Sequence, residues 1–179
     1  DLLTVTAAGA DGLILQPLWS PNSYDYESEA RGSIVGFTEG HTRAHLYRSI
    51  IEGIAFALRQ GKEQIEKRAR RKIQRLVASG GGSQSDSILQ ITADVFALPV
   101  ERPITSETSG LGAAISAAAG AGIYPDLETA AIQMSNTAVR FDPIPENVLI
   151  YDQIYNQVYV KLYDQLRPSF KRIQSIIGR

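Results

Sequence analysis

The sequence contains no cysteine, which excludes disulfide bonds, thiolate metal sites and a cysteine nucleophile. It also lacks an excess of either charge, since 18 Lys and Arg residues stand against 19 Asp and Glu residues. A near-neutral chain has no general attraction to nucleic acid or to anionic membranes. Its apolar stretches are too short to span a bilayer, and no signal peptide is visible. These absences predict a cytoplasmic protein with neither nucleic acid nor membrane as partner.

Familiar catalytic and metal-binding motifs are missing as well. There is no HExxH motif and no Ser-His-Asp pattern. The two histidines, His41 and His45, share one predicted helix face, but no third metal ligand accompanies them. We therefore expect solvated or capping histidines and assign no metal site.

The length of 179 residues and the 44% hydrophobic content suit one domain with an ordinary core. We treat residues 1–179 as that domain, with 148–179 as a C-terminal helical segment. The chain opens at Asp1 without a methionine and runs almost directly into an apolar stretch. We expect it to be part of a longer protein.

The most informative stretch is Lys72–Glu107. An apolar, β-branched run over Ile73–Ser79 leads into three glycines, an apolar pattern of helical period follows over Ser85–Ala97, and Leu98–Arg102 is again strand-like. The change of period from 2 to 3.6 and back predicts two parallel strands joined by a helix.

The turn inside this unit is the predicted binding site. Gly80, Gly81 and Gly82 let the backbone reach positive φ and let a ligand approach the main chain closely. Ser85 or Asp86 can cap the helix, whose first amides point at the same space. A nucleotide site is one interpretation, and a tight turn without a ligand is the other.

A long helix is predicted from near Glu39–Thr42 to about Arg70. Its apolar stripe is expected to contain Leu46, Ile50, Ile54 and Leu58. Glu52 lies within this apolar stretch, so it must be paired or hydrogen-bonded, and Gly53 beside it indicates close packing on the sheet. The basic residues that follow are expected to form a solvated helix end. They are Lys67, Arg68, Arg70, Arg71 and Lys72.

The remaining predicted elements follow the same rules. In chain order they are a buried strand over Leu13–Leu18, a polar loop over Trp19–Arg31, a second strand over Gly32–Phe37, helices over Ser109–Gly120 and Leu127–Met134, a strand over Val139–Phe141, and a helix from about Val148. Pro168 should end or kink the last helix. Its tyrosine stripe is expected at the edge of the core or at a subunit contact, as in a homodimer. The stripe is Tyr151, Tyr155, Tyr159 and Tyr163.

The glycines also come close to a dinucleotide-binding fingerprint. Gly80-x-Gly82-x-x-Ser85 nearly satisfies G-x-G-x-x-G, and Glu101 has the approximate spacing of a ribose-binding acid. The sixth position is serine, however, and no series of βαβ units follows Glu101.

Two segments resemble the FGGY carbohydrate kinases, the group of glycerol kinase, xylulokinase and ribulokinase. GGGSQS with LPVERPITSETSGLGAAISAAAGAG is similar to their C-terminal domain, and ARGSIVGFTEGHTRAHLYRSIIEGIAFALR is similar to their second signature. The strand and loop of DGLILQPLWSP fit too. The positions that match the signature are Gly32, Ile34, Gly36, Phe37, His45, Leu46, Ser49, Ile50 and Glu52. The resemblance covers almost the whole chain and weakens after about Phe141.

This resemblance implies an α/β fold of the ribonuclease H-like type, as in actin and Hsp70, with a mixed sheet flanked by helices. It implies that ATP binds mainly to this domain and the sugar or polyol mainly to an N-terminal one. The adenosine motif matches Gly80, Gly81 and Gly82, with Gly81 against the adenine and Ser85 contacting the base. Gly110, Leu111, Gly112 and Ala113 match the segment behind that pocket.

The resemblance assigns no catalytic residue to this chain. In the family the aspartate base lies in the N-terminal domain, and the phosphate loops precede the segment that matches Asp1 onward. None of Asp11, Asp25 and Asp86 matches them, and the Mg²⁺ ligands are not in this chain. The chain is thus expected to bind ATP or ADP and to be inactive alone. A Rossmann dehydrogenase fragment that binds NAD through Glu101, and a non-catalytic actin- or Hsp70-like assembly module, are the alternatives.

Overall fold

The computed structural model describes residues 2–19 and 29–178. Most of the predicted polar loop Trp19–Arg31 therefore lies outside the described residues. The elements are β1 (Ile14–Gln16), β2 (Ser33–Val35), α1 (Arg43–Ala69), β3 (Leu76–Val77), α2 (Asp86–Phe96), β4 (Val100–Pro103), α3 (Thr108–Gly120), α4 (Leu127–Met134), β5 (Thr137–Phe141), α5 (Pro145–Ile154) and α6 (Val160–Ile177). Short 3-10 turns at Ala10–Gly12 and Gly81–Gln84 and a π-helical turn at Tyr155–Tyr159 join them. None of the helices seen in these residues is long and apolar enough to cross a membrane.

The strands form two small sheets. β1 pairs with β2 in antiparallel fashion. β3 pairs with β4 in parallel and β4 with β5 antiparallel, which makes the second sheet mixed. The predicted parallel pair joined by a helix is confirmed. β3 is shorter than the predicted Ile73–Ser79 because the Ile73 amide donates to Glu66 Oε1 at 2.7 Å, which holds the start of this segment to α1 and away from the sheet.

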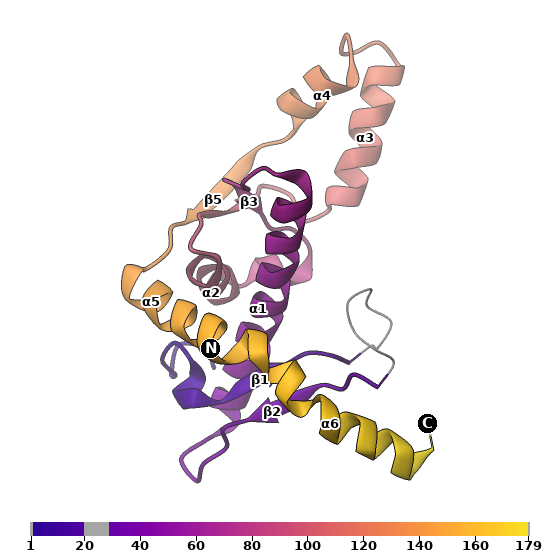
Figure 1. Ribbon diagram of the computed structural model, residues 1–179. Helices are drawn as coiled ribbons and strands as arrows, with labels where there is room; N and C mark the ends of the chain where they lie inside the picture. The colour runs from indigo at the N-terminus through magenta and orange to yellow at the C-terminus, as the bar shows by residue number, and fades with distance from the viewer. Residues whose placement is uncertain (1, 20–28, 179) are drawn as a thin grey trace.

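Helix α1 runs through the centre of the molecule (Figure 1). Thr42 caps its first turn in a capping box completed by His45, and the helix begins where the sequence predicted, near Glu39–Thr42. Gly53 packs against β1 so closely that an added Cβ would lie 2.3 Å from the carbonyl oxygen of Leu15. This contact confirms the close packing predicted at Gly53, and it fixes the rotation of the helix.

The predicted apolar stripe of α1 does not face the core. Ile54 and Leu58 are 42% and 59% exposed. The buried face instead carries Phe56 and two charged side chains, Arg48 and Glu52. The reason is that Gly53 must meet β1, and this turns Glu52 and Phe56 inward and the stripe outward.

Three of the four tyrosines occupy the middle of the main core rather than its edge, whereas Tyr163 is half-buried. Tyr151, Tyr155 and Tyr159 are at most 1% exposed. They surround Phe56, whose ring centroid lies 5.0–5.9 Å from theirs. Each hydroxyl has a partner: Tyr151 donates to Glu52, Tyr155 to Glu63 and Tyr159 to the Gly53 carbonyl. Tyrosine can fill a core when its hydroxyl is satisfied in this way.

Pro168 does not end the last helix, although an end was one of the two outcomes predicted for it. α6 continues through it to Ile177. The carbonyl of Asp164, which proline leaves without a donor, lies on an exposed residue where water can bind it. Beyond the proline, Phe170 is buried beside Tyr163, at a ring distance of 6.3 Å, and this contact anchors the helix.

Helices α3 and α4 lie at one end of the molecule and pack against each other (Figure 1). The small-residue helix forms where the sequence predicted it, over Thr108–Gly120. Only Ile115 and Ala118 of α3 are buried. Most of its small side chains are therefore open to solvent in this chain.

Candidate functional site

The predicted site residues come together in one turn between β3 and α2. The Ala78 amide donates to the Glu101 carbonyl at 2.9 Å, which closes the β3–β4 pairing just before the glycines. Gly80 then adopts φ 86° and ψ −173°, a conformation that essentially only glycine tolerates. The Ser83 amide and hydroxyl both donate to the Gly80 carbonyl, at 3.2 and 2.7 Å, and complete the turn.

The other two glycines have no such role in the turn. Positive φ is confined to Gly80 among the three. A Cβ added at Gly81 or Gly82 would meet no atom within 4 Å. At Gly53 and Gly36, by contrast, neighbouring backbone fills the space at 2.3 and 2.2 Å. Neither backbone strain nor packing therefore requires glycine at Gly81 and Gly82, and their main chain faces open space.

Ser85 is the N-cap of α2. Its Oγ accepts a hydrogen bond from the Ile88 amide at 3.4 Å, which leaves the hydroxyl proton available as a donor. Asp86, the other predicted cap, instead accepts from Arg102 at 2.7 Å. The structure thus decides between the two capping residues that the sequence left open.

Arg102 supports the glycine turn, a role that the sequence did not predict. From β4 its guanidinium donates to the Ser83 carbonyl at 3.1 Å and to Asp86 Oδ1. It also lies over the Phe141 ring, 5.7 Å from the centroid. Arg102 therefore links the glycine turn, the start of α2 and β5. No local sequence signal marks this role, because its partners come from three separate elements.

The start of α3 lies beside the same turn. Ser79 Oγ and Thr108 Oγ1 are 3.2 Å apart and share a hydrogen bond. Two glycines near this end of α3, Gly110 and Gly112, also have nothing within 4 Å of an added Cβ. Bare main chain is therefore present both on the turn and on the neighbouring helix.

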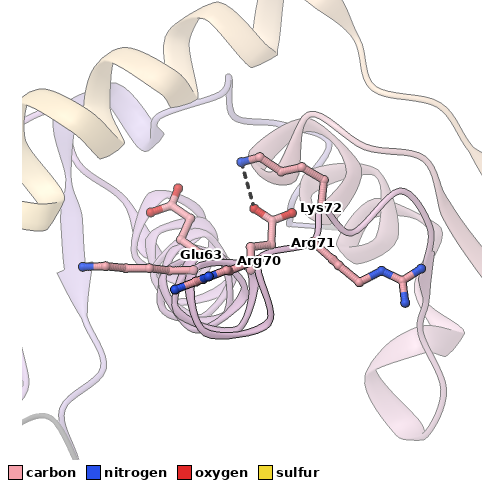
Figure 2. Close-up of a pocket in the computed structure, with 6 residues that line it drawn as sticks. Glu63, Arg70, Arg71 and Lys72 are labelled. Carbon is pink, nitrogen blue, oxygen red and sulfur yellow. Dashed lines mark hydrogen bonds and ion pairs between the residues drawn. The ribbon is translucent and has the colours of Figure 1, made fainter.

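A hollow of about 360 Å³ lies at the C-terminal end of α1 (Figure 2). Its lining combines acidic and basic side chains. They are Glu63, Glu66, Lys67, Arg70, Arg71 and Lys72. At its centre the hydrogen bond from the Ile73 amide, followed by those from Lys62 and Lys72, lowers the pKa of Glu66 to about 2. Glu66 holds the chain reversal after α1 in this way, and the hollow is built around that structural contact.

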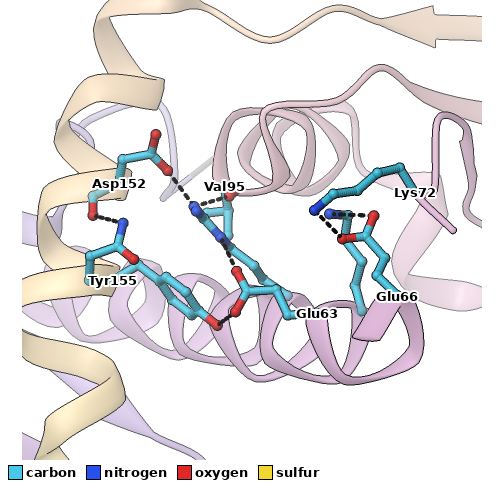
Figure 3. Close-up of polar contacts among 9 residues, drawn as sticks. Glu63, Glu66, Lys72, Val95, Asp152 and Tyr155 are labelled. Atoms are coloured by element: carbon cyan, nitrogen blue, oxygen red, sulfur yellow. Dashed lines mark hydrogen bonds and ion pairs between the residues drawn. The ribbon is translucent and has the colours of Figure 1, made fainter. Parts of the chain in front are cut away.

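Arg59 forms another charged cluster, and Figure 3 labels its neighbours Val95, Asp152 and Tyr155. It donates to Asp152 Oδ1 at 2.6 Å and to the Val95 carbonyl at 2.8 Å, and it lies 4.2 Å from the centroid of the Tyr155 ring. These contacts tie α1 to α2 and α5. Because every charge in the cluster has a partner, its chemistry is structural.

The histidines cap the chain at the start of α1. The Thr38 amide donates to His41 Nδ1 at 2.8 Å, and the Thr42 amide to His45 Nδ1 at 3.1 Å. His45 Nε2 then donates to Asp11 Oδ2 at 3.0 Å. The capping role predicted for the histidines is confirmed. Within residues 2–19 and 29–178, no three metal-ligating side chains come together.

Comparison with known protein families finds a match over most of the chain. Residues 4–121 match the FGGY family of carbohydrate kinases, C-terminal domain. The xylulose kinase of Lactococcus lactis is 35% identical over 157 residues, which are 87% of this chain and 31% of that protein. An uncharacterized sugar kinase of Escherichia coli, YgcE, is 35% identical over 99% of this chain and 37% of its own length.

Solved structures agree with this match. A ligand-bound xylulose kinase from Lactobacillus acidophilus superposes with a TM-score of 0.84 at 26% identity, over 97% of this chain and 35% of that one. The xylulose kinase from Rhodospirillum rubrum has a TM-score of 0.79 at 31% identity, over 95% of this chain and 34% of its own. These neighbours confirm the predicted ribonuclease H-like α/β fold. The chain spans about a third of the length of the relatives it matches.

Proposed function

This chain belongs to the FGGY family of carbohydrate kinases, as a C-terminal domain, and from that premise we propose that it binds ATP at the Gly80–Ser85 turn. In a polypeptide of the relatives' length, which we call the kinase-length enzyme, this chain would be joined to an N-terminal domain. That enzyme would transfer the γ-phosphoryl group of ATP to a sugar or polyol hydroxyl. We place this reaction in the cytoplasm, where ATP is available.

The observation that carries the proposal is the open main chain at Gly81 and Gly82. Neither backbone strain nor packing accounts for glycine there, since both positions have room for a side chain. A flat purine that lies on the backbone does account for it, because a Cβ would separate the ring from the main chain. The Ser85 hydroxyl supplies a donor to orient the base. The residues present therefore fit an adenosine group.

In phosphoryl transfer, ATP with Mg²⁺ supplies the reactive phosphate, and the protein supplies position and charge stabilisation. In our proposal this chain binds and orients the nucleoside, and residues outside it hold Mg²⁺, the phosphates and the sugar. We assign no base here: Asp86 is paired with Arg102 and Asp11 with His45. Asp25 lies outside the described residues.

The dinucleotide-binding alternative has less support from the geometry. β5 runs antiparallel to β4, whereas a Rossmann sheet continues with parallel strands. Glu101, which would bind the ribose, forms an ion pair with Arg75 at 2.6 Å.

Titration of the chain with ATP and with NAD by calorimetry tests the choice between a kinase and a dehydrogenase. Heat of binding with ATP alone supports the kinase, NAD alone supports the dehydrogenase, and neither favours the non-catalytic assembly module.

The isolated chain should show no sugar-dependent ATP turnover. Asp11 is hydrogen-bonded to His45 and Asp86 is ion-paired with Arg102, and the family's base and phosphate loops match no segment of the chain. A coupled ADP-release assay with a panel of pentuloses, hexuloses and polyols measures this. Sugar-dependent turnover that co-purifies with the chain would contradict the expectation. Its loss in a Gly81→Val variant would show that the turnover comes from this chain and not from a contaminating kinase.

Substitution of Ser85 should separate its capping role from its contact with the base. Ser85→Ala loses the cap, which costs about 1 kcal/mol of stability, and raises the KM for ATP by a few-fold through the lost hydrogen bond. Ser85→Asp keeps a capping acceptor but has no donor, so it should retain stability and still raise the KM. Ser85→Asn keeps both groups and is the control. If all three variants of the kinase-length enzyme keep the KM for ATP of the unmodified enzyme, the role of Ser85 is limited to capping α2.

A further inference from the structure

Helix α1 has a second apolar face, opposite the one that packs on β1. Tyr47, Ile54, Leu58 and Ile65 are 37%, 42%, 59% and 58% exposed. Their spacings of seven, four and seven residues place them in one row along the helix. The row forms the outer face of α1.

This outer face lacks the polar character of a solvent-exposed helix surface. Ile50 and Ala57 are half-buried beside the row and extend it sideways. Gly61 lies between Leu58 and Ile65, and an added Cβ there would meet nothing within 4 Å. A continuous apolar strip that includes a small residue is typical of a surface that another element covers closely.

The charged residues of α1 lie to the sides of this strip or beyond it. Arg48, Arg59 and Glu63 bind partners on α5, on the Tyr155–Tyr159 turn or at the start of the chain. Lys67 and Arg68 come only after Ile65, in the last turn. An uncharged strip fits an apolar protein surface and offers nothing to a phosphate backbone or a lipid headgroup.

We infer that the outer face of α1 is the docking surface for the remaining two-thirds of the kinase-length enzyme. The relatives match 87–99% of this chain, and the match fills only 31–37% of their length. In the relatives, a domain of this kind is therefore joined to about twice its own length of further polypeptide. The inference rests on the proposed function only in taking the chain as part of such an enzyme.

The test places Leu58→Gln and Ile65→Gln in the kinase-length enzyme, with Lys67→Gln as a control that lies off the apolar strip of the same helix. If the outer face is covered, each apolar substitution buries an unpaired amide and should lower Tm by at least about 2–4 °C, whereas the control should stay within about 1 °C. In the 179-residue chain, where both side chains are more than half exposed, the same substitutions should leave Tm nearly unchanged. Circular dichroism melts measure all of these.

Two results would overturn the inference. In the first, Leu58→Gln and Ile65→Gln melt with the control in the kinase-length enzyme. In the second, the 179-residue chain sediments as a dimer that Leu58→Gln dissociates, which would make a second copy the occupant. Because Tm is read without substrate, the result stands apart from the proposed function. A Tm loss in an enzyme with no sugar kinase activity would support the docking surface and reject that function.

Discussion

Gly81→Val should raise the KM for ATP of the kinase-length enzyme by about tenfold or more, which corresponds to at least 1.4 kcal/mol of lost binding. The KM for the sugar should change little, because we place the two ligands mainly on different domains. A valine side chain at this position would enter the open space above the turn, where we place the purine. Initial-rate kinetics with each substrate varied in turn measures both constants.

The structure makes this substitution a clean probe. Gly81 has no positive φ and no neighbour within 4 Å, so valine should fold there without strain. Gly40→Val is the matched control, since its added Cβ would meet only Thr38 Oγ1 at an ordinary 3.8 Å in a different loop. Gly80→Ala is the opposite case and should destabilise the domain, because Gly80 has φ 86°. If Gly81→Val folds and its ATP KM equals that of Gly40→Val, the glycines form a turn and nothing more.

Arg48→Met should cause the largest loss of stability, about 3–5 kcal/mol, because it leaves the Glu52 carboxylate buried without its cation. Arg48 lies 3.1 Å from Glu52 and also donates to the Leu3 carbonyl and to Thr6. Glu52 is 3% exposed, and its other donors are the Gly9 amide and Tyr151. Urea denaturation at pH 7 measures the loss. The double variant Arg48→Met/Glu52→Gln, which buries no charge, should recover part of it.

The pH dependence of the single variant provides a second check. Burial raises the pKa of Glu52, and Arg48 opposes that effect in the unmodified protein. Without Arg48 the folded state binds a proton more readily than the unfolded state, where the ordinary pKa is about 4.3. Stability of Arg48→Met should therefore rise as the pH falls from 7 toward 4.3, relative to the double variant. Parallel pH profiles for the single and double variants would show that the lost contacts to Leu3 and Thr6, rather than the buried charge, carry the effect.

The sequence by itself determined the elements whose signals are local. The strand, glycine turn, helix and strand from Ile73 to Arg102 follow from a change of apolar period and a capping serine, which act within a few residues. The start of α1 at Thr42 is equally local. The glycine turn as a candidate site was also predictable, because three glycines before a capped helix are visible in the sequence alone.

Only the tertiary structure decided which faces are buried and which side chains meet. The row through Ile54 and Leu58 and the buried face with Glu52 are both consistent with a helical period, and the close approach of Gly53 to β1 selects between them. The same holds for Arg102, whose partners lie on separate elements. The period of the apolar residues predicts a helix with distinct faces, but it does not predict what each face packs against. Those partners are residues far apart in the chain, and they come into contact only once the chain has folded.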